Sequence, residues 1–282
     1  MHIPLKGWKR WMIILTIPLV IVVVALLVFQ DSLIYLPRRY SDAAIAQAAT
    51  RCTQLEYQTD QGQQTAFYYA PKAGGEAQRI WLLFGGNASV ALDWQDFVET
   101  YPDQRAAFML VDYPGYGRCA GAPSPSRIQA GSDAAFAALA AKLGQPAVEL
   151  EKRTAVLGHS LGAAAACQFA AHHAVTRVVL VSPFTELRAM ARRSVGWPLC
   201  WLLRGNFDNR ERLAEITART PAPPITILHG DNDEVIPVAM GRTLAAELGD
   251  RCSYQEISGA DHNGILEMAE SQIWAAMQPE AR

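Results

Sequence analysis

The pentapeptide Gly158-His159-Ser160-Leu161-Gly162 places a serine where it could act as a nucleophile. The apolar run Thr154 to Leu157 before it is typical of a buried strand, and the alanines after it are strong helix formers. We therefore expect a sharp strand-to-helix turn, whose glycines let the backbones approach closely. Such a turn holds the Ser160 hydroxyl at a helix N-terminus, which favours developing negative charge. The motif is short, and a chance match is the alternative.

A serine hydroxyl needs an adjacent base, and the six histidines of the chain allow a choice by elimination. His262 is chosen because it lies in the loop 258–264, after the last predicted strand, from which it can reach the serine. The excluded residues are His2, before an apolar N-terminal segment; His159, which should point away from Ser160; His172 and His173, at the far end of the following helix; and His229, which more simply supports a turn. An exposed loop histidine is the alternative for His262.

The base needs an acid to fix its tautomer and to stabilise the imidazolium. The segment after the penultimate predicted strand offers Asp231, Asp233 and Glu234. We favour Asp233, because a turn must bring the acid back over the strand end before the next helix starts. Asp231 is the runner-up, and either carboxylate could instead cap a turn or a helix.

A tetrahedral intermediate carries an oxyanion that needs prepositioned hydrogen-bond donors. The residue after the nucleophile, Leu161, is expected to supply one backbone N–H. The second is expected from Asn87, in the loop Gly85 to Ser89 that follows the predicted strand Ile80–Phe84. The glycines of this loop would let its backbone approach a substrate closely.

Strands and helices alternate along most of the chain, which predicts an α/β fold with a mainly parallel, eight-stranded sheet covered on both faces. The expected strands are 52–57, 65–70, 80–84, 106–111, 154–157, 177–181, 225–228 and 253–257. The expected helices are 43–49, 91–101, 128–143, 161–173, 238–248 and 264–277. Every chemically suggestive residue falls just after a strand, which is where ligands bind in such sheets.

The N-terminal part departs from this alternation. Residues 12–29 form an uncharged apolar run long enough, at ~1.5 Å per residue, to cover about 27 Å of a bilayer. We interpret it as a transmembrane signal anchor. The alternative is a cleavable signal peptide, but the run ends in Leu27-Val28-Phe29-Gln30-Asp31, which is a poor cleavage site. Basic Lys6, Lys9 and Arg10 before the span favour a cytoplasmic N-terminus and a catalytic domain on the non-cytoplasmic, periplasmic side.

The expected domain organisation is a cytoplasmic N-terminus at 1–11, the anchor at 12–29, a linker or collar at 30–50, and a catalytic domain at 51–282. The stretch 184–220 lacks a strand, is amphipathic and is inserted between two predicted strands, so we interpret it as a cap over the site, with ordinary surface helices as the alternative. The net charge of −2 over 282 residues gives no electrostatic footprint for nucleic acid. A bridge between Cys119 and Cys200 is a hypothesis that the spacing of the five cysteines leaves open.

These motifs together resemble the α/β-hydrolase superfamily over nearly all of residues 35 to 280. Within it the chain most resembles a membrane-anchored branch of bacterial serine-aminopeptidase-like hydrolases, related to eukaryotic depalmitoylating hydrolases. The resemblance is carried by Tyr35-Leu36-Pro37, Gly86-Asn87-Ala88, Asp112 to Gly117, Gly158 to Gly162, Phe207-Asp208-Asn209, His229 to Pro237 and Asp261-His262-Asn263. One departure is Gly85, where relatives usually have histidine, so we expect looser hydrogen bonding within that loop.

The resulting hypothesis is a serine esterase or thioesterase that works through an acyl-enzyme, with Ser160, His262 and Asp233 as the catalytic triad. The apolar cap and the anchor favour a small-molecule or lipophilic acyl substrate, and no metal or organic cofactor is implied. The alternatives are an aminopeptidase-like amide hydrolase and, in another class, a non-catalytic binding protein on the membrane surface. Tyr113 or Tyr116 could line the pocket or be structural, and the segment 207–209 is expected to fix the cap.

Overall fold

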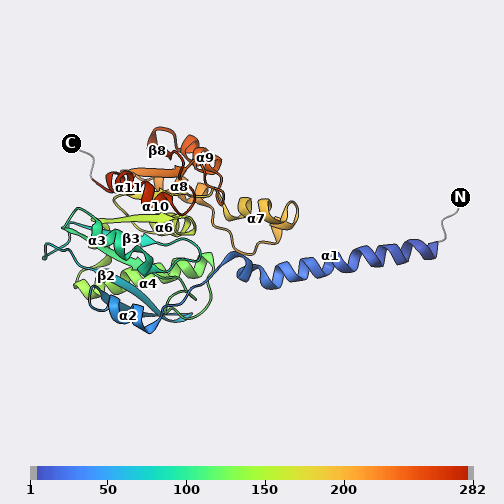
Figure 1. Ribbon diagram of the computed structural model, residues 1–282, viewed down its shortest axis with the longest axis horizontal. Coiled ribbons are helices and arrows are strands. Elements are labelled where there is room, and N and C mark those ends of the chain that lie inside the picture. The colour runs from blue at the N-terminus through green and yellow to red at the C-terminus, as the bar shows by residue number, and fades with distance from the viewer. Residues whose placement is uncertain (1–4, 279–282) are drawn as a thin grey trace.

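A single eight-stranded sheet forms the centre of the molecule, in the order β1-β2-β4-β3-β5-β6-β7-β8 (Figure 1). The computed structural model describes residues 5–278, without the side chains of residues 5–11 and 13. Strands β1, β2 and β4 pair antiparallel in turn, and all the other neighbours are parallel, as predicted. The strands are β1 (Thr53–Thr59), β2 (Gly62–Tyr69), β3 (Arg79–Phe84), β4 (Ala106–Val111), β5 (Thr154–His159), β6 (Val178–Val181), β7 (Ile225–Gly230) and β8 (Cys252–Ile257).

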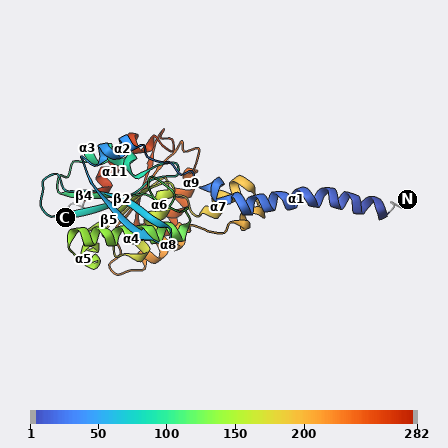
Figure 2. The ribbon, with the colours of Figure 1, turned by 90° about the horizontal axis from the view of Figure 1, so that it is seen from below.

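Helices cover both faces of the sheet (Figures 1 and 2). On one face α4 (Pro125–Leu143), α6 (Leu161–His172), α8 (Asn209–Thr217) and α9 (Val238–Leu248) share one apolar core, which includes Phe136 and Phe169. On the other face α3 (Gln95–Thr100), α10 (Ile265–Met268) and α11 (Glu270–Met277) form a second core. The remaining short elements are α2 (Asp42–Ala48), η1 (Ala91–Trp94), α5 (Ala147–Glu151) and η3 (Gly249–Arg251). Because the central strands are buried on both sides, they read as continuous apolar runs.

The N-terminal helix α1 (Leu5–Ile34) projects away from the sheet domain (Figures 1 and 2). Its segment Ile14–Ile34 has a mean hydropathy of 2.5 and is almost entirely unburied, so it is long and apolar enough to cross a membrane. The helix continues beyond residue 29, the predicted end of the anchor, and Gln30 hydrogen-bonds to the backbone of Leu202 and Arg204 in the folded domain. The side chains of Lys6, Lys9 and Arg10 lie outside the described residues.

The stretch expected to form a cap divides into two parts. Helix α7 (Leu187–Val195) and the turn η2 (Leu199–Leu202) lie beside the C-terminal end of α1 (Figure 1). Helix α8 instead packs on α6, and its Leu213 and Ile216 are fully buried. The part that can cover the site is therefore narrower than 184–220. The apolar spacing of the stretch could not tell a covering helix from one in the helical layer.

All five cysteines lie within the described residues and are free, so the hypothesised bridge between Cys119 and Cys200 is wrong. The Cys119 sulfur is buried beside β2, where it accepts the Thr65 N–H at 3.3 Å. Cys200 lies in η2, beside the cavity described below. The two residues therefore belong to different parts of the molecule.

Candidate active site

Ser160 is the single residue between the end of β5 and the start of α6. Its φ of 57° is unusual for a residue with a side chain, and its N–H donates to the Val181 carbonyl at 2.9 Å. A Cβ atom at Gly158 would overlap the Gly162 carbonyl, and one at Gly162 would overlap the Phe84 carbonyl. The two glycines are thus needed by the close approach of backbones, as the motif predicted. The turn fixes the serine side chain at the carboxyl edge of the sheet.

Three predicted residues meet at this edge, from three separate loops. The Ser160 hydroxyl lies 2.8 Å from His262 Nε2, and His262 Nδ1 lies 2.7 Å from Asp233 Oδ2. All three residues are at least nine-tenths buried. A histidine held in this way can accept the serine proton at Nε2 while it donates its Nδ1–H to the carboxylate.

The Asp233 carboxylate is held by hydrogen bonds on both oxygens. Oδ1 accepts the N–H groups of Val235 and Ile236 at 2.9 and 2.7 Å, and His229 Nε2 lies 3.4 Å from Oδ2. Burial alone would raise the pKa of this carboxyl, but the hydrogen bonds from His229, His262 and the Ile236 N–H outweigh it and hold the pKa well below its usual range. Asp233 is therefore ionised at neutral pH, as an orienting acid must be.

The runner-up acid has a different task. Asp231 is exposed, and its Oδ1 accepts the Gly259 N–H at 2.6 Å, which ties the turn after β7 to the loop after β8. Glu234 is also exposed. Neither carboxylate hydrogen-bonds to His262, so the geometry favours Asp233.

Two other histidines, His159 and His229, hydrogen-bond to the loops that carry His262 and Asp233. The His159 ring reaches the base's loop, where its Nε2–H donates to the His262 carbonyl at 2.8 Å. Burial and the neighbouring His262 lower the pKa of His159 to about 4, so its ring stays neutral near pH 7. His229 Nε2–H donates to the Ile236 carbonyl at 2.9 Å. The first contact joins loops 103 positions apart in the sequence, whereas the second spans only seven positions. Only the position of His159 and His229 at strand ends could have suggested them.

The expected oxyanion residues lie beside the serine. Leu161 and Asn87 line the same cavity as Ser160. The backbone of the Asn87 loop passes so close that a Cβ at Gly86 would lie 3.4 Å from the Ser160 Cβ. This places the loop where its N–H groups can serve a substrate carbonyl held at the serine.

The same loop is held by hydrogen bonds that the sequence did not reveal. The Tyr113 hydroxyl donates to the Gly85 carbonyl at 2.7 Å, and the Tyr116 hydroxyl donates to Asn87 Oδ1 at 2.7 Å. Asn87 Nδ2 donates to the Ile34 carbonyl at the end of α1, at 2.5 Å. The loop is therefore firmly fixed despite Gly85, and the two tyrosines position it instead of lining the cavity.

The segment Phe207-Asp208-Asn209 follows the cap, a name that we now keep for α7 and η2. The Asp208 side chain caps α8 by accepting the Glu211 N–H at 3.1 Å. Asn209 Nδ2 donates to the Phe184 carbonyl at 2.8 Å, which joins the two ends of the cap. The segment thus has the structural role expected of it.

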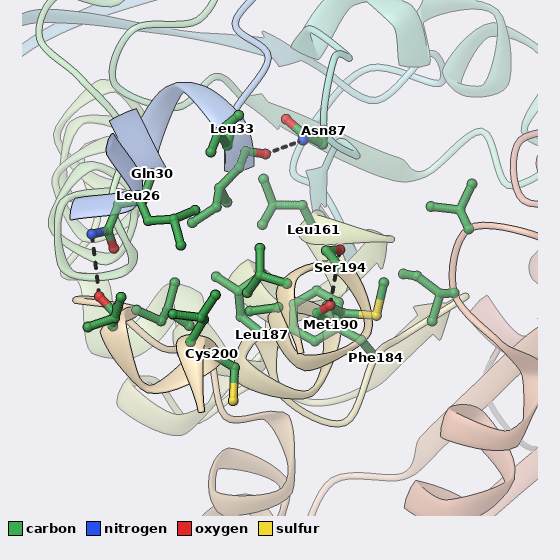
Figure 3. A pocket seen from close by; sticks show the side chains of 18 of the residues that line it. Leu26, Gln30, Leu33, Asn87, Leu161, Phe184, Leu187, Met190, Ser194 and Cys200 are labelled. Atoms are coloured by element: carbon green, nitrogen blue, oxygen red, sulfur yellow. Dashed lines mark hydrogen bonds between the residues drawn. The ribbon is translucent and has the colours of Figure 1, made fainter. Parts of the chain in front are cut away.

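A cavity of about 310 Å³ opens over Ser160, within the range usual for ligand sites (Figure 3). It lies between the end of α1 on one side and the cap on the other. Its polar lining residues are Gln30, Asn87, Ser160 and Ser194, and the rest of the lining is predominantly aliphatic. Among the described residues, no group of three or more histidine, cysteine or acidic side chains could hold a metal ion.

The arrangement is that of the class of α/β hydrolases. The sheet is mostly parallel, a serine follows its fifth strand, and an aspartate and a histidine follow its last two strands. A model of the alpha/beta hydrolase family matches residues 81–216. The chain therefore has the α/β-hydrolase fold, and its central part is similar to this family.

The chain is similar to both bacterial and eukaryotic proteins. It is 28% identical over 235 residues to an uncharacterized protein of Mycobacterium tuberculosis (strain ATCC 25618 / H37Rv), covering 83% of this chain and 80% of that protein. It is 30% identical over 155 residues to alpha/beta hydrolase domain-containing protein 17B of Xenopus laevis, covering 55% of this chain and 49% of that protein. The match thus spans about half the length of the frog protein.

A solved structure extends the likeness of the fold. An esterase of Pyrococcus furiosus matches with a TM-score of 0.65 at 15% identity, covering 86% of this chain and 96% of that chain. At this identity the likeness concerns the fold alone. The family match and the fold both support a hydrolase.

Proposed function

We propose that the protein is a membrane-anchored serine hydrolase that cleaves carboxylic esters or thioesters through an acyl-enzyme. The observation that carries this proposal is the hydrogen-bonded chain from Asp233 through His262 to Ser160, with steps of 2.7 and 2.8 Å, at the floor of an apolar cavity. A low pKa for Asp233, which keeps the acid charged, supports the same assignment.

The first half of the reaction forms the acyl-enzyme. Ser160 Oγ attacks the carbonyl carbon as its proton passes to His262 Nε2, and Asp233 stabilises the imidazolium. The carbonyl oxygen becomes an oxyanion, which the N–H groups of Asn87 and Leu161 stabilise. When the intermediate collapses, the bond to the leaving alcohol or thiol breaks, and His262 gives that group its proton.

The second half reverses these roles with water. His262 takes a proton from a water molecule, the resulting hydroxide attacks the acyl carbon, and the Ser160 bond to the acyl group breaks. Ser160 recovers its proton from His262, and a carboxylic acid leaves. No metal or organic cofactor takes part in this scheme.

The cavity supports an ester or thioester substrate over a peptide. An aminopeptidase must recognise a charged ammonium group, which favours an acidic partner in the site. The residues lining the cavity, within the described part of the chain, include no aspartate or glutamate. Aliphatic side chains on both walls suit an acyl chain instead.

We place the catalytic domain on the non-cytoplasmic side of the membrane, with α1 as the anchor. The apolar segment Ile14–Ile34 supports the anchoring, and the basic residues before it support the orientation. Protease treatment of intact spheroplasts tests this: the domain should be digested from outside. Digestion only after the cells are lysed would refute the orientation.

Labelling with a fluorophosphonate probe tests the catalytic assignment. We expect the wild-type protein to be labelled and Ser160→Ala to be unlabelled, because the probe reacts only with an activated serine. The purified protein should then cleave p-nitrophenyl esters faster than the matching anilides. Absence of labelling in a folded wild-type protein would favour a non-catalytic binding protein, and faster anilide cleavage would favour an amide hydrolase.

A further inference from the structure

One wall of the substrate cavity belongs to the anchor. The described residues of α1 that line the cavity are Leu26, Gln30, Leu33 and Ile34. The opposite wall comes from the cap, with Leu187 and Met190 facing across the space (Figure 3). Ser160 and Leu161 close the cavity below, so the last turns of the anchor take part in shaping the site.

The cavity residues of α1 share one face of the helix. They follow Leu26 by four, seven and eight positions, which is the spacing of one helical stripe. Val24 and Val28 lie on the other side and are 51% and 60% exposed. All of these residues fall within the segment Ile14–Ile34, which is long and apolar enough to span a bilayer. The same helix therefore offers one face to lipid and one face to the cavity.

Hydrogen bonds hold α1 in register with the cap and the site. Gln30 is buried, its Oε1 accepts the Arg204 N–H at 2.8 Å, and its Nε2 donates to the Leu202 carbonyl at 3.4 Å. At the end of the helix, the Ile34 carbonyl accepts from Asn87 Nδ2. A glutamine buried at the edge of an apolar helix is costly unless it is satisfied, so these contacts fix the helix against the cap.

The outer side of the cap suits the headgroup region next to α1. Helix α7 carries arginines at 188, 192 and 193 on the side away from the cavity, and Trp197 and Trp201 follow it, 72% and 64% exposed. Tryptophan and arginine together are typical of the membrane interface, where rings reach the acyl boundary and cations meet phosphates. The cap and the helix end lie on the same side of the molecule (Figures 1 and 2).

We propose that α1 is a substrate-binding element as well as an anchor, and that the acyl chain enters between α1 and the cap directly from the bilayer. This inference rests on the proposed function. Leu26 and Leu33 then act as specificity-determining residues, because they contact the chain beyond the ester group. The substrate would be an ester or thioester whose long acyl chain already resides in the membrane.

The test uses the full-length protein in vesicles of phosphatidylcholine and phosphatidylglycerol. Leu26→Trp fills the cavity from the α1 side, and Val28→Trp is the matched control on the lipid side of the same helix turn. The rates on p-nitrophenyl palmitate and butyrate are compared for each variant. Each methylene of the acyl chain that loses its contact should lower the rate ~4-fold. Blocking three methylenes in Leu26→Trp should therefore lower the palmitate-to-butyrate rate ratio roughly 60-fold. Val28→Trp should keep the wild-type ratio.

A second variant guards against misfolding. Leu26→Ala only removes atoms, and the space it opens should move the preferred acyl length upward in an ester series. Equal palmitate-to-butyrate ratios for Leu26→Trp and Val28→Trp, or an unmoved optimum in Leu26→Ala, would overturn the role of α1 while leaving the serine hydrolase intact. A wild-type protein that cleaves neither ester and is not labelled by the fluorophosphonate would remove the proposed function, and this inference with it.

Discussion

Asp233→Asn changes the chemistry at the acid and almost nothing of its shape. An amide oxygen can still accept the N–H groups of Val235 and Ile236, which lie 2.9 and 2.7 Å from Oδ1. The amide nitrogen then takes the place of Oδ2, 2.7 Å from His262 Nδ1, and it donates where the carboxylate accepted. The imidazole must then carry its own proton on Nε2. This nitrogen faces the Ser160 hydroxyl and can no longer accept the serine proton.

The expected loss is large because it removes the base, not merely a contact. A wrong tautomer in this kind of triad lowers kcat by about 10⁴-fold, which corresponds to ~5.5 kcal/mol of barrier. Stability should change far less, since the backbone donors keep an acceptor and only the charge assistance is lost, about 1–2 kcal/mol. Activity and stability should thus separate clearly in this variant.

Asp231→Asn is the matched control, two positions away. Its carboxylate accepts the Gly259 N–H at 2.6 Å and does not touch His262, and an amide oxygen can keep that contact. We expect kcat/KM for p-nitrophenyl butyrate to stay within roughly 3-fold of wild type, as is usual for an exposed substitution. Circular dichroism melting curves check that both variants fold. Full activity in Asp233→Asn with a loss in Asp231→Asn would refute the assignment.

Three further predictions concern groups around the triad. His159→Phe leaves the His262 carbonyl without its donor, so kcat/KM should fall about 10-fold. Because the His159 ring is neutral above pH ~5, this loss should be the same at pH 6 and pH 8 in rate profiles. Tyr116→Phe removes a donor to Asn87 and should lower kcat more than it raises KM, by up to ~10-fold, in ester kinetics. Burial raises the pKa of Asp112 to about 7, so the folded state binds more protons than the unfolded state between pH ~4 and 7. The protein should therefore lose stability as pH rises through that window. Asp112→Asn should flatten this pH dependence in thermal unfolding.

The meeting of Ser160, His262 and Asp233 could be predicted because each residue is tied to a local pattern. The turn at Ser160 needs small neighbours, which the sequence displays as glycines, and His262 follows the last apolar run of the chain. Asp233 was separable from Asp231 because a turn has to reverse the chain over the strand end. Strand ends and tight turns are properties of a few consecutive residues, so they can be seen without the fold.

The contacts that support the site could not be predicted in this way. Asn87 meets the Ile34 carbonyl and the Tyr116 hydroxyl, which come from segments far away along the chain. An asparagine in a glycine-rich loop has the same local pattern whether its side chain is free or bonded. Helix α8 shows the same limit, since its apolar face could cover either the site or α6. Such pairings depend on the tertiary arrangement, which no local periodicity encodes.

The end of α1 is joined directly to the loop beside Ser160. A helix leaves its last carbonyls without partners, and at Ile34 the missing donor is the side-chain amide of Asn87, in the loop Gly85 to Ser89. The chain has no flexible spacer here, because Tyr35 is already buried and the Leu36 N–H donates to Asn87 Oδ1 at 2.9 Å. Asn87 therefore bonds to the backbone on both sides of the helix terminus. The hydrogen bonds that end α1 are the same ones that orient the Asn87 side chain. A helix attached through a loose linker could still hold the protein at a membrane, but it would leave that loop without these partners.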